Sequence, residues 1–482
     1  MKKRLLAAAL AALMLLPLAS CGNADDPADS GNSPSDTSAD TEITNFPDIE
    51  KQNYNGETFQ MIGWNEPGSW YFSEEYESSE KGGSILNNTI YEMNTMVEEY
   101  LNVELAYQTV EVVNGHEIFN TVYPSVMAGD DTYQLCTLHA YYDYPSFITQ
   151  NLATDFYSLN DLDLDASYWN RGVMDMLAID GKAYIGLSDL CQYSLYMIYC
   201  NKDLMKRAGM AVPYDDVRNG QWTLDKFISM TTGLYADNGD GQRNELDTYG
   251  FASLWDGEGN AFLQASDIYV AKRNDDGNFE LTLYNDRLVE MYDKLYTWSR
   301  NESVLCWNFH SPVFTVPFKN NQSYFTCSSL GTHFLDAEFE VGILPLPKYD
   351  LQQPSYNHVN WGNNLIIPNT IKDPEMVGRV VELMSYYSET IVLPKYYDEV
   401  LQLRVSEAPD DRDMVELIYD TIVYDPAIAF CDGSSALSNL VYITCFGIRN
   451  NNENITSYYK TNSKQASKWL TSIIKKVQKF NE

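Results

Sequence analysis

The sequence contains few of the residues that most often carry catalysis or bind metals. Only 5 histidines occur in 482 residues, and no two of them have His-x-x-x-His spacing. None of the 8 cysteines forms a Cys-x-x-Cys pair, the spacing that many zinc and redox sites use. An odd number of cysteines remains after Cys21, which argues against a complete disulfide framework and favours small buried side chains. We therefore expect neither a zinc site nor a redox centre.

Catalytic sequence motifs and internal repeats are also lacking. The chain has no nucleophile elbow, phosphate-binding loop, dinucleotide fingerprint or metalloprotease helix. Carboxylates are so abundant that no pair stands out as the two acids of a glycosidase. No segment repeats along the chain at a fixed period. These absences favour a protein that is not an enzyme.

Positive charge is scarce. The 32 Lys and Arg residues are outnumbered by 68 Asp and Glu residues, so the formal net charge is -36 at pH 7. A chain of this charge is repelled by polyanions, and we expect neither nucleic acid nor anionic lipid as a partner. A neutral or cationic ligand fits this charge better, although acidity also serves solubility.

The N-terminus carries the features of a secretion signal. Basic residues 2–4 precede an apolar run over residues 5–18, which is too short for a settled transmembrane helix. The run ends in Leu-Ala-Ser-Cys-Gly, which matches the bacterial lipobox. We expect a signal peptide over residues 1–20 and a lipid on Cys21, which would anchor the protein on the extracytoplasmic face of the cell membrane. The alternative is an ordinary cleaved signal with a cysteine there by chance.

A polar segment follows the lipobox. From Gly22 to about Phe46 the chain is rich in Asp, Ser, Pro, Asn and Thr and has almost no large apolar side chains. Such a segment cannot bury enough surface to fold. We therefore predict a disordered acidic tether over residues 21–50, which would hold a folded body away from the membrane.

The segment from Leu177 to Phe227 has the most specific pattern. Asp180-Gly181 lies between short apolar runs and predicts a two-residue hairpin turn, because both positions of that turn need a positive φ. Residues 193–200 predict a buried strand. Asn201 is placed to cap a short helix, and Gly209 to end it in the left-handed conformation.

A second helix follows in this segment. Thr223 is placed to cap it, and Trp222 to pack on Phe227 as a hydrophobic staple. A strand ending in Tyr-Cys-Asn-Lys-Asp, a helix ending in Ala-Gly, a Pro loop and this capped helix follow one another in order. The order resembles the extracellular solute-binding proteins of bacterial ABC importers, the maltodextrin-binding-like class. The family's pattern has no residue that corresponds to Cys200, and its Trp follows the Thr, whereas here Trp222 precedes Thr223. The match is therefore incomplete.

The resemblance implies an α/β protein of the two-lobed periplasmic-binding-protein fold, class II-like, with a hinge and a ligand cleft between the lobes. It extends patchily from about residue 54 to the C-terminus. We expect lobe 1 to comprise residues 51–160 and 327–390, and lobe 2 to comprise residues 161–326 and 391–482. Residues 339–347 resemble the family's strand-plus-Pro segment at the return to the first lobe.

Aromatic side chains beside polar ones mark the expected ligand site. The chain contains 36 Tyr and 9 Trp. A sugar ring has apolar C–H faces and a polar rim, so a sugar site needs flat aromatic rings with Asp, Asn or Glu nearby. For each of these Trp residues an ordinary packing role is the alternative, and Trp222 is left out because the staple explains it. The predicted ligand-binding residues are Trp64, Asn65, Trp70, Tyr141, Tyr142, Asp189, Trp255, Trp307, Trp361 and Asn363.

Residues 237–247 look like an EF-hand-type calcium loop. Alternating oxygen ligands around a glycine are what calcium requires, and Asn238, Asp240 and Asp247 fall at ligand positions. The first ligand position of that register is occupied by Ala236, so a solvated acidic turn is the alternative. No cofactor is required, and calcium would be structural.

The sequence as a whole predicts a lipid-anchored, monomeric binding protein that captures an oligosaccharide and delivers it to the permease subunits of an ABC transporter. Peptide or another polar solute is the alternative ligand. Two other classes share the anchor and the aromatic content: a secreted carbohydrate-hydrolysing lipoprotein, and a helical-repeat glycan-binding lipoprotein.

Overall fold

The computed structural model describes residues 46–64, 85–111, 113–191, 194–253, 257–306, 316–329, 337–395 and 409–481. The predicted signal peptide, the predicted lipidation site Cys21 and most of the predicted tether lie outside these residues. Pro47 to Glu482 form one compact unit. Pro47 and Ile49 are buried in that unit, and the Tyr100 hydroxyl donates to the Ile49 carbonyl oxygen over 3.0 Å. The tether predicted over residues 21–50 is therefore too long at its C-terminal end, because two apolar side chains after Phe46 join the core.

One sheet has four strands in the order β12-β3-β1-β2. Strand β1 runs parallel to both β2 and β3, and β12 runs antiparallel to β3. Parallel strands are covered on both faces, and the buried side chains Phe59, Met61 and Ile62 of β1 agree with this. The strands are β1 (Glu57–Trp64), β2 (Val103–Val110), β3 (Leu135–His139) and β12 (Asn363–Ile366).

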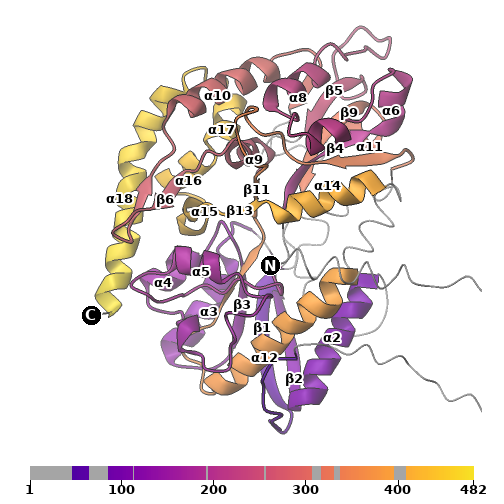
Figure 1. Ribbon diagram of the computed structural model, residues 1–482. Helices are drawn as coiled ribbons and strands as arrows, with labels where there is room; N and C mark the ends of the chain where they lie inside the picture. Colours follow the sequence, from indigo (N-terminus) through magenta and orange to yellow (C-terminus); the bar gives the residue numbers. More distant parts are fainter. Residues whose placement is uncertain are drawn as a thin grey trace, which may run out of the picture. The chain divides into compact units, whose positions relative to one another are not determined.

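Helices from distant parts of the chain accompany this sheet. Helix α12 contacts α2, as Figure 1 shows, and Asp373 caps α12 by accepting a hydrogen bond of 2.9 Å from Met376 N. Pro374 occupies the first turn, where its missing N–H has no partner to lose. The helices are α2 (Ile85–Leu101), α3 (Glu117–Ala128), α4 (Tyr144–Thr149), η1 (Phe156–Ser158), α5 (Arg171–Leu177), α12 (Pro374–Tyr387) and η3 (Ser388–Val392).

The other large sheet has five strands in the order β10-β4-β9-β5-β8. Strand β4 is antiparallel to β10 and β9, whereas β5 is parallel to β9 and β8. The strands are β4 (Tyr196–Asn201), β5 (Tyr249–Ser253), β8 (Val304–Cys306), β9 (Ser323–Ser329) and β10 (Val341–Leu344). Short two-stranded sheets pair β6 (Ala271–Arg273) with β7 (Phe279–Leu281) and β11 (His358–Val359) with β13 (Ile422–Val423).

The remaining helices are numerous and mostly short. They are α6 (Lys202–Arg207), α7 (Tyr214–Arg218), α8 (Leu224–Thr231), α9 (Gly257–Ala265), α10 (Asp286–Ser299), α11 (Val316–Lys319), α14 (Pro409–Asp420), α15 (Pro426–Phe430), α16 (Ala436–Val441), α17 (Ile443–Arg449) and α18 (Ile455–Asn481). Among the described residues, no helix combines the length and the apolar character that crossing a bilayer requires. The seven cysteines after Cys21 are unpaired, and all except the half-buried Cys306 are buried, as expected.

The local predictions for residues 177–227 are confirmed. Asp180 and Gly181 have φ values of 51° and 74° and form the turn of a hairpin. Asn201 Oδ1 accepts a hydrogen bond from Leu204 N over 2.9 Å, which caps α6. The rings of Trp222 and Phe227 meet edge to face with centroids 5.9 Å apart, which is the predicted staple.

The sequence predicted that the chain returns to the first lobe at residue 327, and this position is wrong. Strands β9 and β10 pair with β4 in the five-stranded sheet, and only β12 re-enters the four-stranded sheet. Residues 327–329 of β9 and strand β10, which the sequence placed in lobe 1, therefore belong with residues of lobe 2. A buried apolar strand carries no signal for which of two sheets it joins, because that depends on partners distant in the sequence.

Three segments run side by side between the two large sheets: the residues around Gly186 and Leu195, the residues around Asn360 and Leu365, and strand β13. Gly186 bridges to Leu365, Leu195 bridges to Asn360, and β11 pairs with β13. Each segment therefore shares backbone pairing with another. Such paired segments are suited to the role of a hinge, because a small change of backbone dihedrals in a few residues can be absorbed there.

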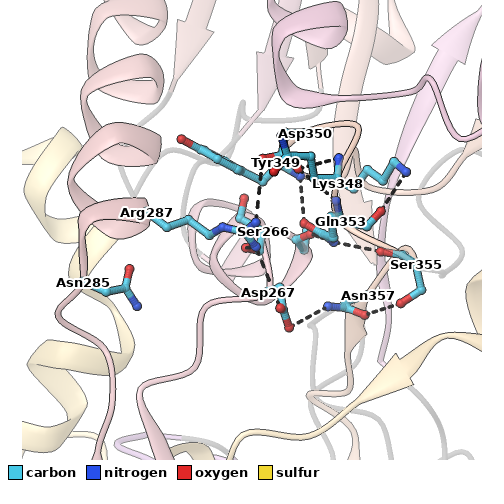
Figure 2. Close-up of polar contacts among 12 residues, drawn as sticks. Ser266, Asp267, Asn285, Arg287, Lys348, Tyr349, Asp350, Gln353, Ser355 and Asn357 are labelled. Carbon is cyan, nitrogen blue, oxygen red and sulfur yellow. Dashed lines mark hydrogen bonds and ion pairs between the residues drawn. The ribbon is translucent and has the colours of Figure 1, made fainter.

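A polar network fixes the segment between β10 and β11 (Figure 2). Gln353 Nε2 donates to the Ala265 carbonyl oxygen over 2.8 Å, and Lys348 Nζ donates to the Gln353 carbonyl oxygen over 2.9 Å. Arg287 Nη1 donates to the Ser266 carbonyl oxygen over 3.1 Å. The network ties this connecting segment to the C-terminal end of α9 and the start of α10.

Candidate functional site

The carboxyl ends of β1 and β3 bring the first site residues together. Because the two strands are parallel, Trp64 and His139 lie at the same edge of the sheet. Their rings are stacked, with centroids 6.2 Å apart and planes 9° apart. Strand β12 is antiparallel to β3 and begins at Asn363, opposite His139. The predicted ligand residues Trp64 and Asn363 therefore share one edge.

The loop after β3 adds two tyrosines. His139 Nδ1 accepts a hydrogen bond from Tyr141 N over 3.3 Å. Loss of surrounding water lowers the pKa of His139, although part of the residue is exposed, so the ring is neutral and Nδ1 can accept. The ring of Tyr142 lies 5.6 Å from Trp64 and 5.8 Å from His139. Both predicted tyrosines thus join the edge that holds Trp64.

Trp361 reaches the same place from the connecting segments. Its backbone N–H donates to the Ser194 carbonyl oxygen over 3.0 Å, and Asn360 Oδ1 accepts from both Ser194 N and Gly362 N. Its ring lies 6.1 Å from Tyr141. Its indole Nε1 is buried and has no hydrogen-bond partner among the described residues.

Tyr442, which the sequence analysis did not select, completes the aromatic cluster. It lies between α16 and α17, and its ring is 4.8 Å from Tyr141 and 5.7 Å from Trp361. No local pattern around it points to a site, since its partners are distant in the sequence. We call Trp64, His139, Tyr141, Tyr142, Trp361 and Tyr442 the aromatic cluster.

Burial divides this cluster into supporting and accessible members. Trp64, Tyr141 and Trp361 are only 4%, 5% and 3% exposed. Tyr142 is half-buried, and so is Asn363 at the start of β12. Their accessible surface makes Tyr142 and Asn363 the predicted residues best placed to touch a ligand, while the buried rings hold Tyr142 in position.

Two glycines make room for Tyr142. A Cβ atom at Gly115 would lie 2.5 Å from the Tyr142 ring, and one at Gly433 would lie 2.6 Å from it. Both glycines also have positive φ, 85° and 77°, which other residues rarely adopt. The close approach of two backbone segments therefore fixes where this ring can lie.

A histidine–carboxylate pair lies beside Tyr142. His116 Nδ1 is 2.8 Å from Asp143 Oδ1, and Asp143 Oδ2 accepts from Phe119 N over 3.1 Å. The hydrogen bond to Asp143 is the main cause that raises the pKa of His116, while burial raises the pKa of Asp143. The rings of His116 and Tyr142 meet edge to face at 6.1 Å. The pair holds the loop that carries Tyr142, and its residues could not be paired from sequence alone.

The other predicted ligand residues do not join this cluster in the described part of the chain. Asn65, Trp70, Trp255 and Trp307 lie outside the described residues. The strands that precede Trp255 and Trp307 end at Ser253 and Cys306, which are direct neighbours in the five-stranded sheet. The backbone N–H of Asp189 donates to the Tyr168 carbonyl oxygen over 2.8 Å, and its side chain is half-buried.

The expected calcium loop gathers three carboxylates. Oxygen atoms of Asp237, Asp240 and Asp247 lie within 4.8 Å of one another. Asp247 is almost fully buried and accepts hydrogen bonds from Asn238 N, Asn244 N and the Tyr235 hydroxyl. Burial opposes ionisation of Asp247, but these hydrogen bonds outweigh it and lower its pKa. The third predicted ligand, Asn238, accepts from Asp240 N through Oδ1 over 3.0 Å.

Comparison with known proteins identifies the fold. No family model matches this chain, and no curated protein matches it. Among solved structures, an ABC substrate-binding protein of Listeria monocytogenes in complex with cycloalternan is 17% identical, with a TM-score of 0.58 over 86% of this chain and 98% of that one. A solute-binding protein of Thermotoga lettingae bound with α-D-tagatose is 14% identical, with a TM-score of 0.57 over 86% and 100% of the two chains.

A third similar structure is the galacto-N-biose-/lacto-N-biose I-binding protein of Bifidobacterium longum, in complex with lacto-N-biose. It is 11% identical, with a TM-score of 0.56 over 87% of this chain and 98% of that one. The chain therefore has the two-lobed α/β fold of these ABC solute-binding proteins, as the sequence predicted. At these identities the similarity concerns the fold.

Proposed function

We propose that this protein captures an oligosaccharide outside the cell and delivers it to the permease of an ABC importer. The observation that carries the proposal is the aromatic cluster at the carboxyl edge of the four-stranded sheet. Open α/β sheets bind ligands outside the carboxyl ends of their strands. The cluster gathers aromatic rings at such an edge, next to the segments that connect the two sheets.

The chemistry of the edge suits a sugar. The half-buried ring of Tyr142 offers a flat face for the C–H side of a pyranose, and the Asn363 amide offers a donor and an acceptor for hydroxyl groups. The buried Trp361 indole N–H adds a donor that no described protein atom satisfies. Trp64 and Tyr141 act as supports that keep Tyr142 in place.

Three further observations support the ligand class and the mode of binding. The similar proteins named above were solved with cycloalternan, tagatose or lacto-N-biose, all of them neutral sugars. A neutral ligand also suits a chain of net charge -36. Paired connecting segments between two sheets are suited to closing on a ligand without covalent chemistry.

The proposal includes an acyl anchor on Cys21, no catalytic activity and a monomeric state. Calcium at Asp240 and Asp247 is proposed as a structural ion only. The helical-repeat alternative does not agree with two large sheets. Among the described residues, Asp143 is hydrogen-bonded to His116 and Glu382 accepts from the Trp169 indole, so these two buried carboxylates serve the fold.

Calorimetry with a panel of neutral oligosaccharides tests the proposal. The Tyr142→Ala variant should lose affinity by about 1–3 kcal/mol, as a truncated contact residue does. Tyr459→Ala is the matched control, because Tyr459 is also half-buried and stacked on another tyrosine, Tyr284, but belongs to α18. Binding of peptides and of no sugar would reject the ligand class. Release of smaller sugars by the pure protein would reject a pure binding role.

A further inference from the structure

Helix α18 carries charge of the opposite sign to the rest of the chain. Residues 455–481 include six lysines and no acidic residue, so the helix contributes +6 to a chain of net charge -36, and all other residues together carry -42. All six lysines are exposed. We call them the lysine stripe: Lys460, Lys464, Lys468, Lys475, Lys476 and Lys479.

The lysine stripe occupies one face of the helix. At about 100° per residue, the six positions fall within roughly half of the helix circumference, opposite the buried positions. The buried side chains are Ile455, Ala466, Leu470, Ile473, Ile474 and Val477. Helix α18 contacts α16, α17, β7, α4 and α10, and it lies along one side of the ribbon in Figure 1. Its apolar side chains are buried, and the six lysines opposite them are exposed.

These lysines differ from others in the chain. Lys226, Lys294 and Lys202 pair with carboxylates at 3.1, 2.7 and 2.5 Å. Among the described residues, no member of the lysine stripe makes an ion pair with a carboxylate. Lys460, Lys464 and Lys468 follow one another at intervals of four residues, a spacing at which like charges repel and weaken a helix. The stability of the helix therefore does not explain the stripe.

We propose that the lysine stripe docks on the surface of a bilayer that contains anionic phospholipids. A helix of 27 residues is about 40 Å long, so its exposed face presents a row of charges that fits a partner with an extended surface better than a small anion. Clusters of four to eight basic residues on an amphipathic helix bind anionic lipid headgroups in this way.

The net charge of the chain does not prevent this docking. Charges are screened over about 8 Å at physiological salt, so the stripe responds mainly to the headgroups that it touches. The net charge, taken alone, argues against anionic lipid as a partner. Because the charge is unevenly distributed, α18 is a local exception. Contact along the stripe would orient the body on the membrane rather than anchor it, because a single weak signal gives only reversible attachment.

Vesicle sedimentation tests the inference with residues 21–482 carrying Cys21→Ser, so that neither the apolar run of residues 5–18 nor an acyl chain contributes. Vesicles of phosphatidylglycerol and phosphatidylcholine in equal parts are compared with pure phosphatidylcholine. Binding is expected only to the anionic vesicles and should disappear at high salt. The triple variant Lys464→Gln, Lys468→Gln and Lys475→Gln should weaken partitioning by about tenfold or more.

A matched control removes the same charge elsewhere. Lys206, Lys372 and Lys395 are exposed and dispersed over other elements, so Lys206→Gln, Lys372→Gln and Lys395→Gln together should leave partitioning within about twofold. Equal loss of vesicle partitioning in both triple variants would overturn the inference, because net charge alone would then determine vesicle binding. Absence of binding by the parent, equal binding to neutral vesicles, or tight binding of soluble polyglycerol phosphate without vesicle association would overturn it as well.

Discussion

Tyr141 and Tyr442 meet edge to face with their ring centroids 4.8 Å apart, although about 300 residues separate them in the sequence. Tyr141 follows β3 of the four-stranded sheet. Tyr442 precedes α17, which contacts α9 and α10. This contact joins the edge of the four-stranded sheet to the short helices near the C-terminus, as the contacts of α4 with α15 and α18 also do.

Trp361→Phe should lower the affinity for oligosaccharide by about fivefold while keeping most of the stability. The substitution keeps an aromatic ring beside Tyr141 but removes the buried Nε1 donor, which has no described partner. A ligand hydroxyl that accepts from that donor would be lost, and one hydrogen bond is worth about 1 kcal/mol net. Calorimetry measures the affinity and thermal unfolding the stability. Trp361→Ala serves as the comparison and should lower Tm much more, because it leaves a cavity. Unchanged affinity in Trp361→Phe would exclude the indole N–H from the site.

Gly433→Ala should destabilise the protein and weaken ligand binding together. The new Cβ atom would lie 2.6 Å from the Tyr142 ring in a backbone with φ of 77°. Gly209→Ala is the matched control, since Gly209 has a similar φ of 69° but nothing within 4 Å of a Cβ atom. The control should cost about 1–2 kcal/mol from the left-handed backbone alone and leave the affinity unchanged. Equal effects of the two substitutions on ligand affinity would show that Tyr142 does not contribute to the ligand site.

The pair of His116 and Asp143 should make stability depend on pH. The hydrogen bond to Asp143, aided by the charges of Asp432 and Glu117, raises the pKa of His116 in the folded protein. The resulting stabilisation is fully present below the unfolded pKa, near 6.5, and is lost as pH rises through the higher folded pKa. Parent and His116→Gln should therefore differ most in Tm near pH 5.5, and the difference should shrink towards pH 8.5.

The pH range is chosen to isolate His116. Burial raises the pKa of Asp143 above its usual value, so this carboxyl is itself a source of pH dependence at the acidic end of the range. The comparison with His116→Gln, which keeps Asp143, therefore reports on the imidazole best in the upper part of the range. A difference in Tm that stays constant over this range, or that grows with rising pH, would mean that His116 is not charged in the folded protein.

Cys21→Ser should release the protein from the membrane fraction after a wash in high salt. The substitution removes the predicted acyl site, and the wash removes any electrostatic attachment through the lysine stripe. Fractionation followed by immunoblotting measures the distribution. The parent protein should stay with the membrane through the same wash. Retention of the washed variant would show that another part of the chain is the anchor.

Calcium, if it binds, should stabilise the protein without changing the affinity for sugar. Oxygen atoms of Asp237, Asp240 and Asp247 lie within 4.8 Å of one another, and an ion bound only to the folded form raises Tm by mass action. A chelator should lower the Tm of the parent and leave that of Asp240→Asn unchanged. Calorimetry should give the same affinity for sugar with and without the chelator. A parent Tm that does not respond to the chelator would identify the loop as a solvated acidic turn.

The sequence predicted the local structure well because short-range rules decide it. Asp180-Gly181 forms its turn, Asn201 and Thr223 cap their helices, and Trp222 packs on Phe227. Each of these depends on a few neighbouring residues whose backbone conformations and hydrogen bonds are set by their own side chains. The fold class followed from the order of these features.

The candidate site could be predicted only in part. Trp64, Tyr141, Tyr142, Trp361 and Asn363 were selected because each lies in or beside a loop that joins a strand, and the structure brings them to one edge. Tyr442 was not selected, because no pattern in the short helices around it differs from ordinary packing. The pairing of His116 with Asp143 could not be predicted from the sequence either, because it depends on how α3 packs beside the loop that follows β3.

The sequence by itself determined the turns, caps, amphipathic helices and buried strands, and through their order the class of fold. Tertiary structure alone decided that β9 and β10 join the five-stranded sheet, that Tyr142 lies against Gly115 and Gly433, and that Trp64 is buried as a support. It also showed that the lysines of α18 lie opposite its covered apolar face. The physical reason is that a strand's partner, a ring's exposed fraction and the partner of a charge depend on contacts between residues far apart in the chain, which no local pattern encodes.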